Sequence, residues 1–242
     1  MAAGGTTTFL AVRDYDLAAT LDCGQAFRWA RAEGSAWRGV VAARWVEVQP
    51  APGGLQARVA EPVADWGWLV DYLQVDLDLE AVLRTFPADA PLQAAVEACR
   101  GLRLLRQDPW ECLASFILSS TKQIVQIRQI VELLCSRFGQ PVAVPPGVPP
   151  CFAFPTAARL AEVGEGELRA CKMGFRAPHL LGAARRVAAG ELDLARMRTL
   201  PLAEARRGIH QPENRDRLQA SRQRLVFDEF LLLQLRSEEH TS

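Results

Sequence analysis

The sequence has little lysine and little histidine, and it lacks the paired cysteines of most structural metal sites. Its lysines are Lys122 and Lys172 alone, and its three histidines lie far apart. The six cysteines are scattered without a CxxC pair. Disulfide frameworks and zinc sites need regularly spaced cysteines or histidines, so we expect a reduced, cytoplasmic protein that holds no metal.

Long apolar runs and several enzyme signatures are also absent. Hydrophobic residues make up 49% of the chain, but no uninterrupted apolar run approaches the ~18–20 residues of a membrane helix. The first residues, MAAGGTTTF, lack the basic start and apolar core of a secretory signal. No GxSxG or HExxH motif occurs, and VGEGE at 163–167 lacks the glycine spacing of a phosphate loop. Membrane proteins, nucleophile-elbow hydrolases and zinc peptidases therefore have no support.

Charge is balanced overall but unevenly distributed. Residues 61–97 carry eight acids against Arg84, whereas residues 169–198 carry seven bases against Glu191 and Asp193. A basic segment of this kind is a typical footprint of a polyanion partner. An ordinary solvated helix face gives the same pattern, and charge alone favours that alternative.

Hydrophobic periodicity divides the chain into a β-rich part and a helical part. Residues 7–60 alternate apolar and polar positions in short pieces, which predicts an antiparallel β-meander. Helical spacing follows from Trp66, and Asp108 before Pro109 is a clear helix start. The next helix carries an apolar stripe and should end at Gly139, and the proline-rich residues 141–150 should form a surface loop.

Four separated blocks, in this order, carry a resemblance to a known family: LDCGQAFRW (21–29), LLRQDPWECLASFILSSTKQIVQIRQIVELLCSRFG (104–139), FPTAARLAE (154–162) and LRACKMGFRAPHLLGAARRV (168–187). Together they resemble the 8-oxoguanine DNA glycosylase/AP lyase family of the helix-hairpin-helix superfamily, over roughly residues 7–208. The resemblance implies an α+β fold, with an antiparallel β-sheet N-terminal domain packed on a helical glycosylase domain. It implies base-excision repair of double-stranded DNA containing 8-oxoguanine, by a monomer without a cofactor, at the nucleoid of a bacterium.

The resemblance implies that Gly24 and Gln25 bind the flipped base. 8-Oxoguanine carries a hydrogen on N7, where guanine has a lone pair. A backbone carbonyl at Gly24 would accept that hydrogen and repel the lone pair, which is worth ~1–3 kcal/mol of discrimination. Only a residue without a side chain lets the backbone come so close. The alternative is a bulge or turn glycine.

Other family positions imply contacts with the DNA around the flipped base. Phe175 matches an aromatic wedge and Arg176 an arginine that donates to the unpaired cytosine, although Phe175 could also be a core residue behind Gly174. The family has three asparagines at 121–123 and an arginine at 126. Here Thr121 is expected at a base edge and Lys122 at a phosphate, and Gln126 also counts as a DNA-binding position.

The family's catalytic segment has no counterpart here. Its LPGVG hairpin, the lysine that attacks the sugar and a later aspartate are all missing, so the sequence predicts no catalytic residue and an inactive chain. Residues 209–235 instead resemble a segment of branch-migration DNA helicases, and RSEEHTS is what a common sequencing adapter encodes in frame. We therefore expect a β-rich domain at 7–106, a partial helical domain at 107–208, a foreign helical tail at 209–235 and a disordered tail at 236–242.

Three readings of function remain open at this point. The first is a base-excision enzyme by family, and the second is a damaged-DNA-binding module without catalysis. The third is an accessory fragment of a DNA helicase. A genuinely divergent tail is the alternative to a fusion.

Overall fold

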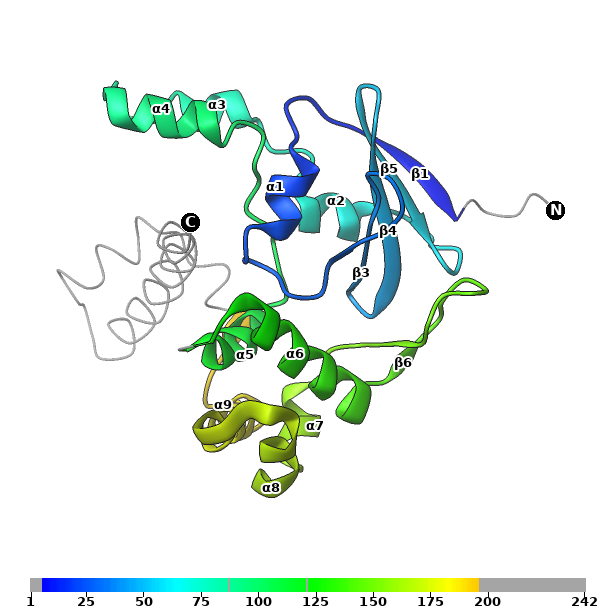
Figure 1. Ribbon diagram of the computed structural model, residues 1–242, viewed down its shortest axis with the longest axis vertical. Coiled ribbons are helices and arrows are strands. Elements are labelled where there is room, and N and C mark those ends of the chain that lie inside the picture. The colour runs from blue at the N-terminus through cyan, green and yellow to red at the C-terminus, as the bar shows by residue number, and fades with distance from the viewer. Residues whose placement is uncertain (1–5, 87, 121, 196–242) are drawn as a thin grey trace. The chain divides into compact units, whose positions relative to one another are not determined.

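The computed structural model describes residues 6–86, 88–120 and 122–195. The chain forms two compact units (Figure 1). Of the described residues, those from 6 to 107 and the segment Gly139–Phe154 form the first unit. The segment Asp108–Phe138 and residues 155–195 form the second. The tail expected at 209–242 lies outside the described residues. The first unit holds an antiparallel sheet and the second holds helices, so the predicted α+β class is confirmed.

Five antiparallel strands form the sheet of the first unit, in the order β1-β5-β4-β3-β2. Strands β2 to β5 follow one another as a meander, whereas β1 pairs with β5 at the opposite edge. The strands are β1 (Thr7–Ala11), β2 (Ala30–Arg31), β3 (Trp37–Val41), β4 (Arg44–Ala51) and β5 (Gly54–Val59).

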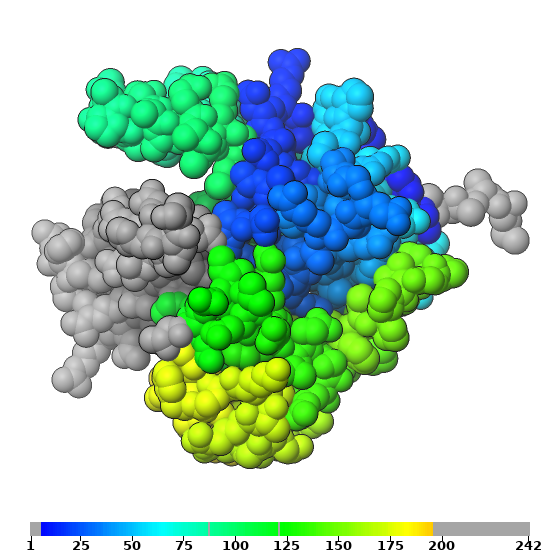
Figure 2. Space-filling model, in the orientation of Figure 1, coloured from blue at the N-terminus to red at the C-terminus, as the bar shows by residue number. Residues whose placement is uncertain are grey.

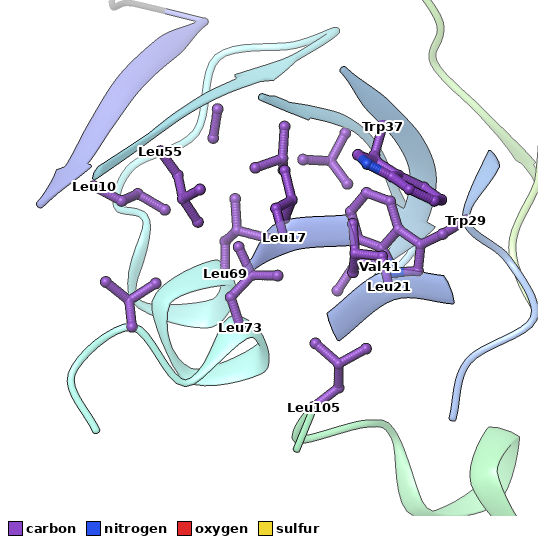
Figure 3. Close-up of a cluster of buried hydrophobic side chains, with 14 of the residues drawn as sticks. Leu10, Leu17, Leu21, Trp29, Trp37, Val41, Leu55, Leu69, Leu73 and Leu105 are labelled. Atoms are coloured by element: carbon purple, nitrogen blue, oxygen red, sulfur yellow. The ribbon is translucent and has the colours of Figure 1, made fainter. Parts of the chain in front are cut away.

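The core of this unit lies between one face of the sheet and two helices, α1 (Leu17–Asp22) and α2 (Gly67–Leu73). Alternation places Leu55, Ala57 and Val59 of β5 in the core while their neighbours face outward. Figure 3 shows Leu17 and Leu21 of α1 and Leu69 and Leu73 of α2 directed at the sheet residues. The period of two seen in the sequence thus reports a half-buried sheet.

Part of the predicted meander is helical instead. Residues 17–22 form α1, and of residues 26–30 in the predicted meander only Ala30 lies in a strand, β2. Asp16 begins α1, since its Oδ1 accepts a hydrogen bond from the Ala19 backbone N–H at 2.8 Å. A six-residue helix is too short for its 3.6-residue period to show in the sequence. The N-cap Asp16 is the one local feature that indicates where this helix begins.

Two short helices, α3 (Leu79–Leu83) and α4 (Ala90–Ala98), project from the sheet domain (Figures 1 and 2). Neither contains a buried residue among those described. Asp78 and Asp89 cap them by accepting from the Ala81 and Leu92 backbone N–H groups. Helix capping therefore accounts for part of the acidic excess at 61–97.

Residues 139–154 return to the first unit as a hairpin. Strands β6 (Pro141–Val142) and β7 (Cys151–Phe152) form a two-stranded ladder. The proline-rich residues 143–150 between them form the connecting loop, as the sequence predicts, but Pro141 and Val142 of the predicted loop form β6 instead. A two-stranded ladder has only edge strands, where proline is tolerated.

The second unit is helical. Asp108 caps α5 as predicted, because its Oδ1 accepts from the Trp110 and Glu111 N–H groups at 3.0 and 2.9 Å. The predicted apolar stripe of α6 is confirmed, with Ile127, Ile130 and Leu134 buried. Its elements are α5 (Pro109–Ser119), α6 (Ile124–Phe138), α7 (Ala157–Ala161), α8 (Glu165–Leu168), the π-helical turn η1 (Arg169–Met173), the 3-10 turn η2 (Gly174–Arg176) and α9 (Ala177–Ala188). Across the described ranges, no helix has both the length and the apolar character needed to cross a membrane.

Candidate nucleic-acid interface

Gly24 lies in a bend after α1 and not in a strand, so the strand context expected from the sequence is wrong. The reason is that α1 ends at Asp22 and strand structure begins again only at Ala30. The φ of Gly24 is 82°, a left-handed conformation that glycine adopts without the steric cost of a Cβ, and the residue is buried. Backbone conformation alone is thus one reason for glycine here. The contact of its carbonyl with a base stays a prediction.

The Gln25 side chain fastens this bend to a segment far along the chain. Its amide nitrogen donates to the carbonyl oxygens of Thr20 at 2.8 Å and Arg103 at 2.9 Å. Its amide oxygen accepts from the Leu105 backbone N–H at 2.8 Å. Gln25 is 2% exposed, so its amide is turned into the protein and positions Gly24. A contact between this amide and a base stays a prediction.

Two residues that the sequence did not single out support the same bend. Gln107 donates from Nε2 to the carbonyl oxygen of Gln25 at 2.5 Å. Arg103 is buried; its backbone N–H donates to Thr20 Oγ1 at 3.1 Å, and its guanidinium donates to the Gly101 carbonyl at 3.1 Å. Burial lowers the pKa of the Arg103 guanidinium. Arginine is mostly exposed in proteins, so the sequence carries no signal for this position.

The remaining residues of LDCGQAFRW are also held by the fold of the first unit. The Arg28 guanidinium donates to the Phe152 carbonyl of the hairpin. The Trp29 indole N–H donates to the Tyr72 hydroxyl at 2.9 Å, and the ring is buried in the core. Side chains on both sides of Gly24 are therefore hydrogen-bonded within the first unit.

In the second unit, two predicted DNA-binding residues are described: Lys122 lies in the connector between α5 and α6, and Gln126 lies in the first turn of α6. Lys122 is half-buried, and its backbone N–H donates to the Ser119 carbonyl at 3.1 Å. Gln126 is exposed, and its Oε1 accepts from the Gln123 N–H at 3.4 Å, at the start of α6. Thr121 lies outside the described residues. The DNA contacts of all three stay predictions.

The turn at 172–176 presents an aromatic side chain to solvent. Lys172 has a φ of 62° and Gly174 a φ of 60°, so the chain reverses sharply between η1 and η2. Phe175 follows and is 57% exposed. The alternative of a core phenylalanine does not describe this side chain, whose exposure suits a wedge.

Arg176, by contrast, is 3% exposed. Its Nη1 donates to the Met173 carbonyl at 3.2 Å and its Nη2 donates to the Ser120 carbonyl. Its Cζ lies 4.3 Å from the centroid of the Phe175 ring. Arg176 thus brings the 172–176 turn together with the end of α5. Donation to an unpaired cytosine stays a prediction.

The basic segment at 169–198 is partly neutralised by ion pairs. Arg169 lies 2.8 Å from Glu165, and Arg186 lies 3.5 Å from Glu191. Arg196 and Arg198 are outside the described residues. Lys172 forms no ion pair with a carboxylate in the described ranges, so its charge faces solvent uncompensated.

Other catalytic groups find little support in the part of the chain that the structure describes. No group of three histidine, cysteine, aspartate or glutamate side chains there could hold a metal ion. Burial raises the pKa of the Cys112 thiol to about 12, which disfavours a nucleophilic thiolate. Base recognition by Gly24 and Gln25 and duplex contacts by Phe175 and Arg176 stay predictions.

Comparison with known proteins finds similarity to DNA glycosylases. Residues 8–113 match a family model described as 8-oxoguanine DNA glycosylase, N-terminal domain. N-glycosylase/DNA lyase OGG1 of Arabidopsis thaliana is 29% identical over 170 residues, which cover 67% of this chain and 46% of that protein. The chain therefore spans about half the length of this curated relative.

Solved structures share the fold. MBOgg1 in complex with a low affinity DNA ligand aligns with a TM-score of 0.78 and 28% identity, covering 94% of this chain and 76% of that one. The Clostridium acetobutylicum 8-oxoguanine glycosylase/lyase in complex with dsDNA containing cytosine opposite to 8-oxoG aligns with a TM-score of 0.74 and 26% identity, covering 91% and 78%.

Proposed function

We propose that this chain, whose N-terminal domain and relatives support the 8-oxoguanine DNA glycosylase family, recognises 8-oxoguanine in double-stranded DNA. The observation that carries the proposal is the exposure of Phe175 on a sharply bent turn of the helical unit. A flipped base leaves a gap in the stack, and an exposed aromatic side chain can fill it. The protein acts as a monomer without a cofactor, in the cytoplasm where a bacterium holds its nucleoid.

Discrimination of the oxidised base is assigned to the backbone of Gly24. The N7 hydrogen of 8-oxoguanine donates to the Gly24 carbonyl, whereas the N7 lone pair of guanine is repelled by it. Gln25 and Gln107 hold the bend by hydrogen bonds to buried backbone groups, so the carbonyl cannot relax toward either base. Preorganisation of this kind turns one missing hydrogen bond into selectivity.

Replacement of Gly24 by alanine is expected to reduce lesion selectivity. A Cβ at Gly24 would obstruct the approach of the base, and a φ of 82° would strain the bend. The ratio of affinities for 8-oxoguanine and guanine duplexes should fall about 5- to 150-fold, the equivalent of ~1–3 kcal/mol. Fluorescence anisotropy with both duplexes measures this ratio.

Gly34→Ala is the matched control for backbone strain. Gly34 has a φ of 66°, and a Cβ there would meet nothing within 4 Å. This variant should be strained to a similar degree and yet keep its selectivity. Equal loss of selectivity in both variants would contradict a direct role of Gly24.

Phe175→Ala is expected to weaken binding to lesion-containing duplex by about 5- to 150-fold, because base–aromatic stacking contributes ~1–3 kcal/mol. Distortion at the lesion, followed by 2-aminopurine fluorescence beside the damaged base, should decrease as well. Phe9→Ala is the control, since Phe9 is 53% exposed but lies on the edge strand β1. Similar losses in both variants would argue against Phe175 as the wedge.

The relatives are named for glycosylase and lyase activity. For this chain we propose recognition of the damaged base but not the bond cleavage. By family, the reaction is hydrolysis of the N-glycosidic bond followed by β-elimination through a lysine Schiff base. The described lysines are Lys172, which is exposed, and Lys122, which is half-buried in the α5–α6 connector. Neither lysine lies in a buried pocket, which favours the second candidate function, a damaged-DNA-binding module that does not itself cleave the N-glycosidic bond.

A further inference from the structure

Lys172 holds a backbone conformation that glycine adopts at lower cost. Its φ and ψ are 62° and 19°, in the left-handed region, at the point where η1 turns into η2. Helices commonly end with glycine in this conformation because a Cβ crowds the neighbouring carbonyl. Lysine here therefore makes the turn less stable than glycine would, and packing offers no compensation, because the side chain is exposed.

The ammonium group of Lys172 is also electrostatically available. No hydrogen bond or ion pair joins it to another described residue, whereas the nearby Arg169 is engaged by Glu165 at 2.8 Å. Within the described part of the chain, Lys172 is thus exposed and without a charged partner, whereas Arg176 is buried and donates to two carbonyl groups.

Position relates this cation to the exposed aromatic ring. Lys172 and Phe175 belong to one turn, and Arg176 fastens that turn to the end of α5 through the Ser120 carbonyl. The ammonium group and the ring are thus carried by a short, anchored stretch of chain. A base that leaves the stack beside Phe175 has backbone phosphates on either side of it.

We propose that Lys172 binds a phosphodiester group of duplex DNA next to the step that Phe175 enters. The inference rests on the proposed function and adds a ligand class, the DNA backbone phosphate, at a residue with no other assigned role. In this proposal, the left-handed backbone directs the Lys172 cation to the phosphate. The contact of Lys172 with a phosphate should contribute to the affinity for DNA and not to the selectivity between bases.

The test is the salt dependence of affinity for undamaged and 8-oxoguanine duplexes. Lys172→Gln should weaken binding to both duplexes equally and lower the slope of log affinity against log salt by about 0.9, the loss of one phosphate contact. With this change in slope, the ratio of wild-type affinity to variant affinity should be about eightfold larger at 0.1 M salt than at 1 M salt. Lys172→Arg should keep the wild-type slope.

Arg159→Gln is the matched control. It also removes one exposed positive charge from the helical unit, but from α7, where Arg159 lies 3.8 Å from Glu162. Its slope should equal that of the wild type. An equal decrease in both variants would show a net-charge effect and would overturn the inference.

Lys172→Gly supplies a readout that DNA binding alone cannot give. It should raise the melting temperature of the protein by relieving the left-handed strain, while it weakens DNA binding as Lys172→Gln does. An unchanged slope in Lys172→Gln, with the effect of Phe175→Ala intact, would overturn this inference and leave the proposed function standing. A wild-type protein that binds neither duplex in a salt-dependent way would overturn both.

Discussion

Borohydride reduction of this 242-residue chain with duplex DNA containing 8-oxoguanine is expected to give no covalent adduct. Trapping requires a lysine whose neutral amine attacks the sugar, and a neutral amine requires a desolvated pocket. Lys172 is exposed and Lys122 only half-buried, and the sequence contains no third lysine. Gel electrophoresis under denaturing conditions detects a shifted species directly.

The lysine variants decide how a positive result would be read. A trapped species that persists in both Lys122→Ala and Lys172→Ala would contradict the proposal that this chain lacks a Schiff-base lysine. Capture that disappears only in Lys122→Ala would show that Lys122 is the attacking residue and not a phosphate contact. A complete glycosylase/lyase on the same DNA serves as the positive control.

Truncation of Arg176 to alanine is expected to destabilise the helical unit by about 2–5 kcal/mol, because the buried Met173 carbonyl left without its donor costs ~1–3 kcal/mol and the cavity left by the side chain adds to this loss. Two acceptors lose a donor, the carbonyl oxygens of Met173 and Ser120. The buried guanidinium also leaves a cavity beneath the Phe175 ring. Hydrogen exchange of the α6 and α9 amides localises the loss to this unit.

Arg185→Ala is the control for Arg176→Ala. Arg185 is exposed in the last turn of α9, the helix that begins directly after Arg176. A surface substitution of this kind usually changes stability by less than ~0.5 kcal/mol. Arg176→Lys should lie between the two, because it keeps the charge and one donor. Equal stability of the two alanine variants would refute a fastening role for Arg176 and leave only its predicted contact with DNA.

Stability measurements on Arg176→Ala distinguish a folding role of a residue in the helical unit from a direct role in DNA recognition. A loss of DNA binding in Arg176→Ala alone is ambiguous, because the same side chain fixes the turn that carries Phe175. Phe175→Ala and Lys172→Gln do not share this ambiguity, since both side chains are exposed. Variants of Phe175 and Lys172 therefore test DNA contacts, and variants of Arg176 test the stability of the turn that carries them.

Local signals in the sequence predicted much of the helical unit. Asp108 before Pro109 predicts the start of α5, and Asp108 does cap that helix. The stripe that includes Ile127, Ile130 and Leu134 predicts the buried face of α6, since a 15-residue helix displays its period several times. The bend at Gly24 was not predicted, because α1 is too short for its period to compete with the surrounding alternation.

The sequence by itself determined the α+β class, the sheet and helix segments with long periodic patterns, and the family resemblance that singles out Gly24 and Phe175. These properties follow from short-range periodicity, helix capping and the order of motifs, all of which depend on residues that are close in sequence. Only the tertiary structure decided that Gln25 and Arg176 are buried and that Phe175 is exposed. The two buried side chains depend on backbone groups far along the chain: Gln25 bonds to residues 103 and 105, and Arg176 bonds to residue 120. Burial of a polar side chain is decided by whether distant partners satisfy it, and no local pattern records where those partners lie.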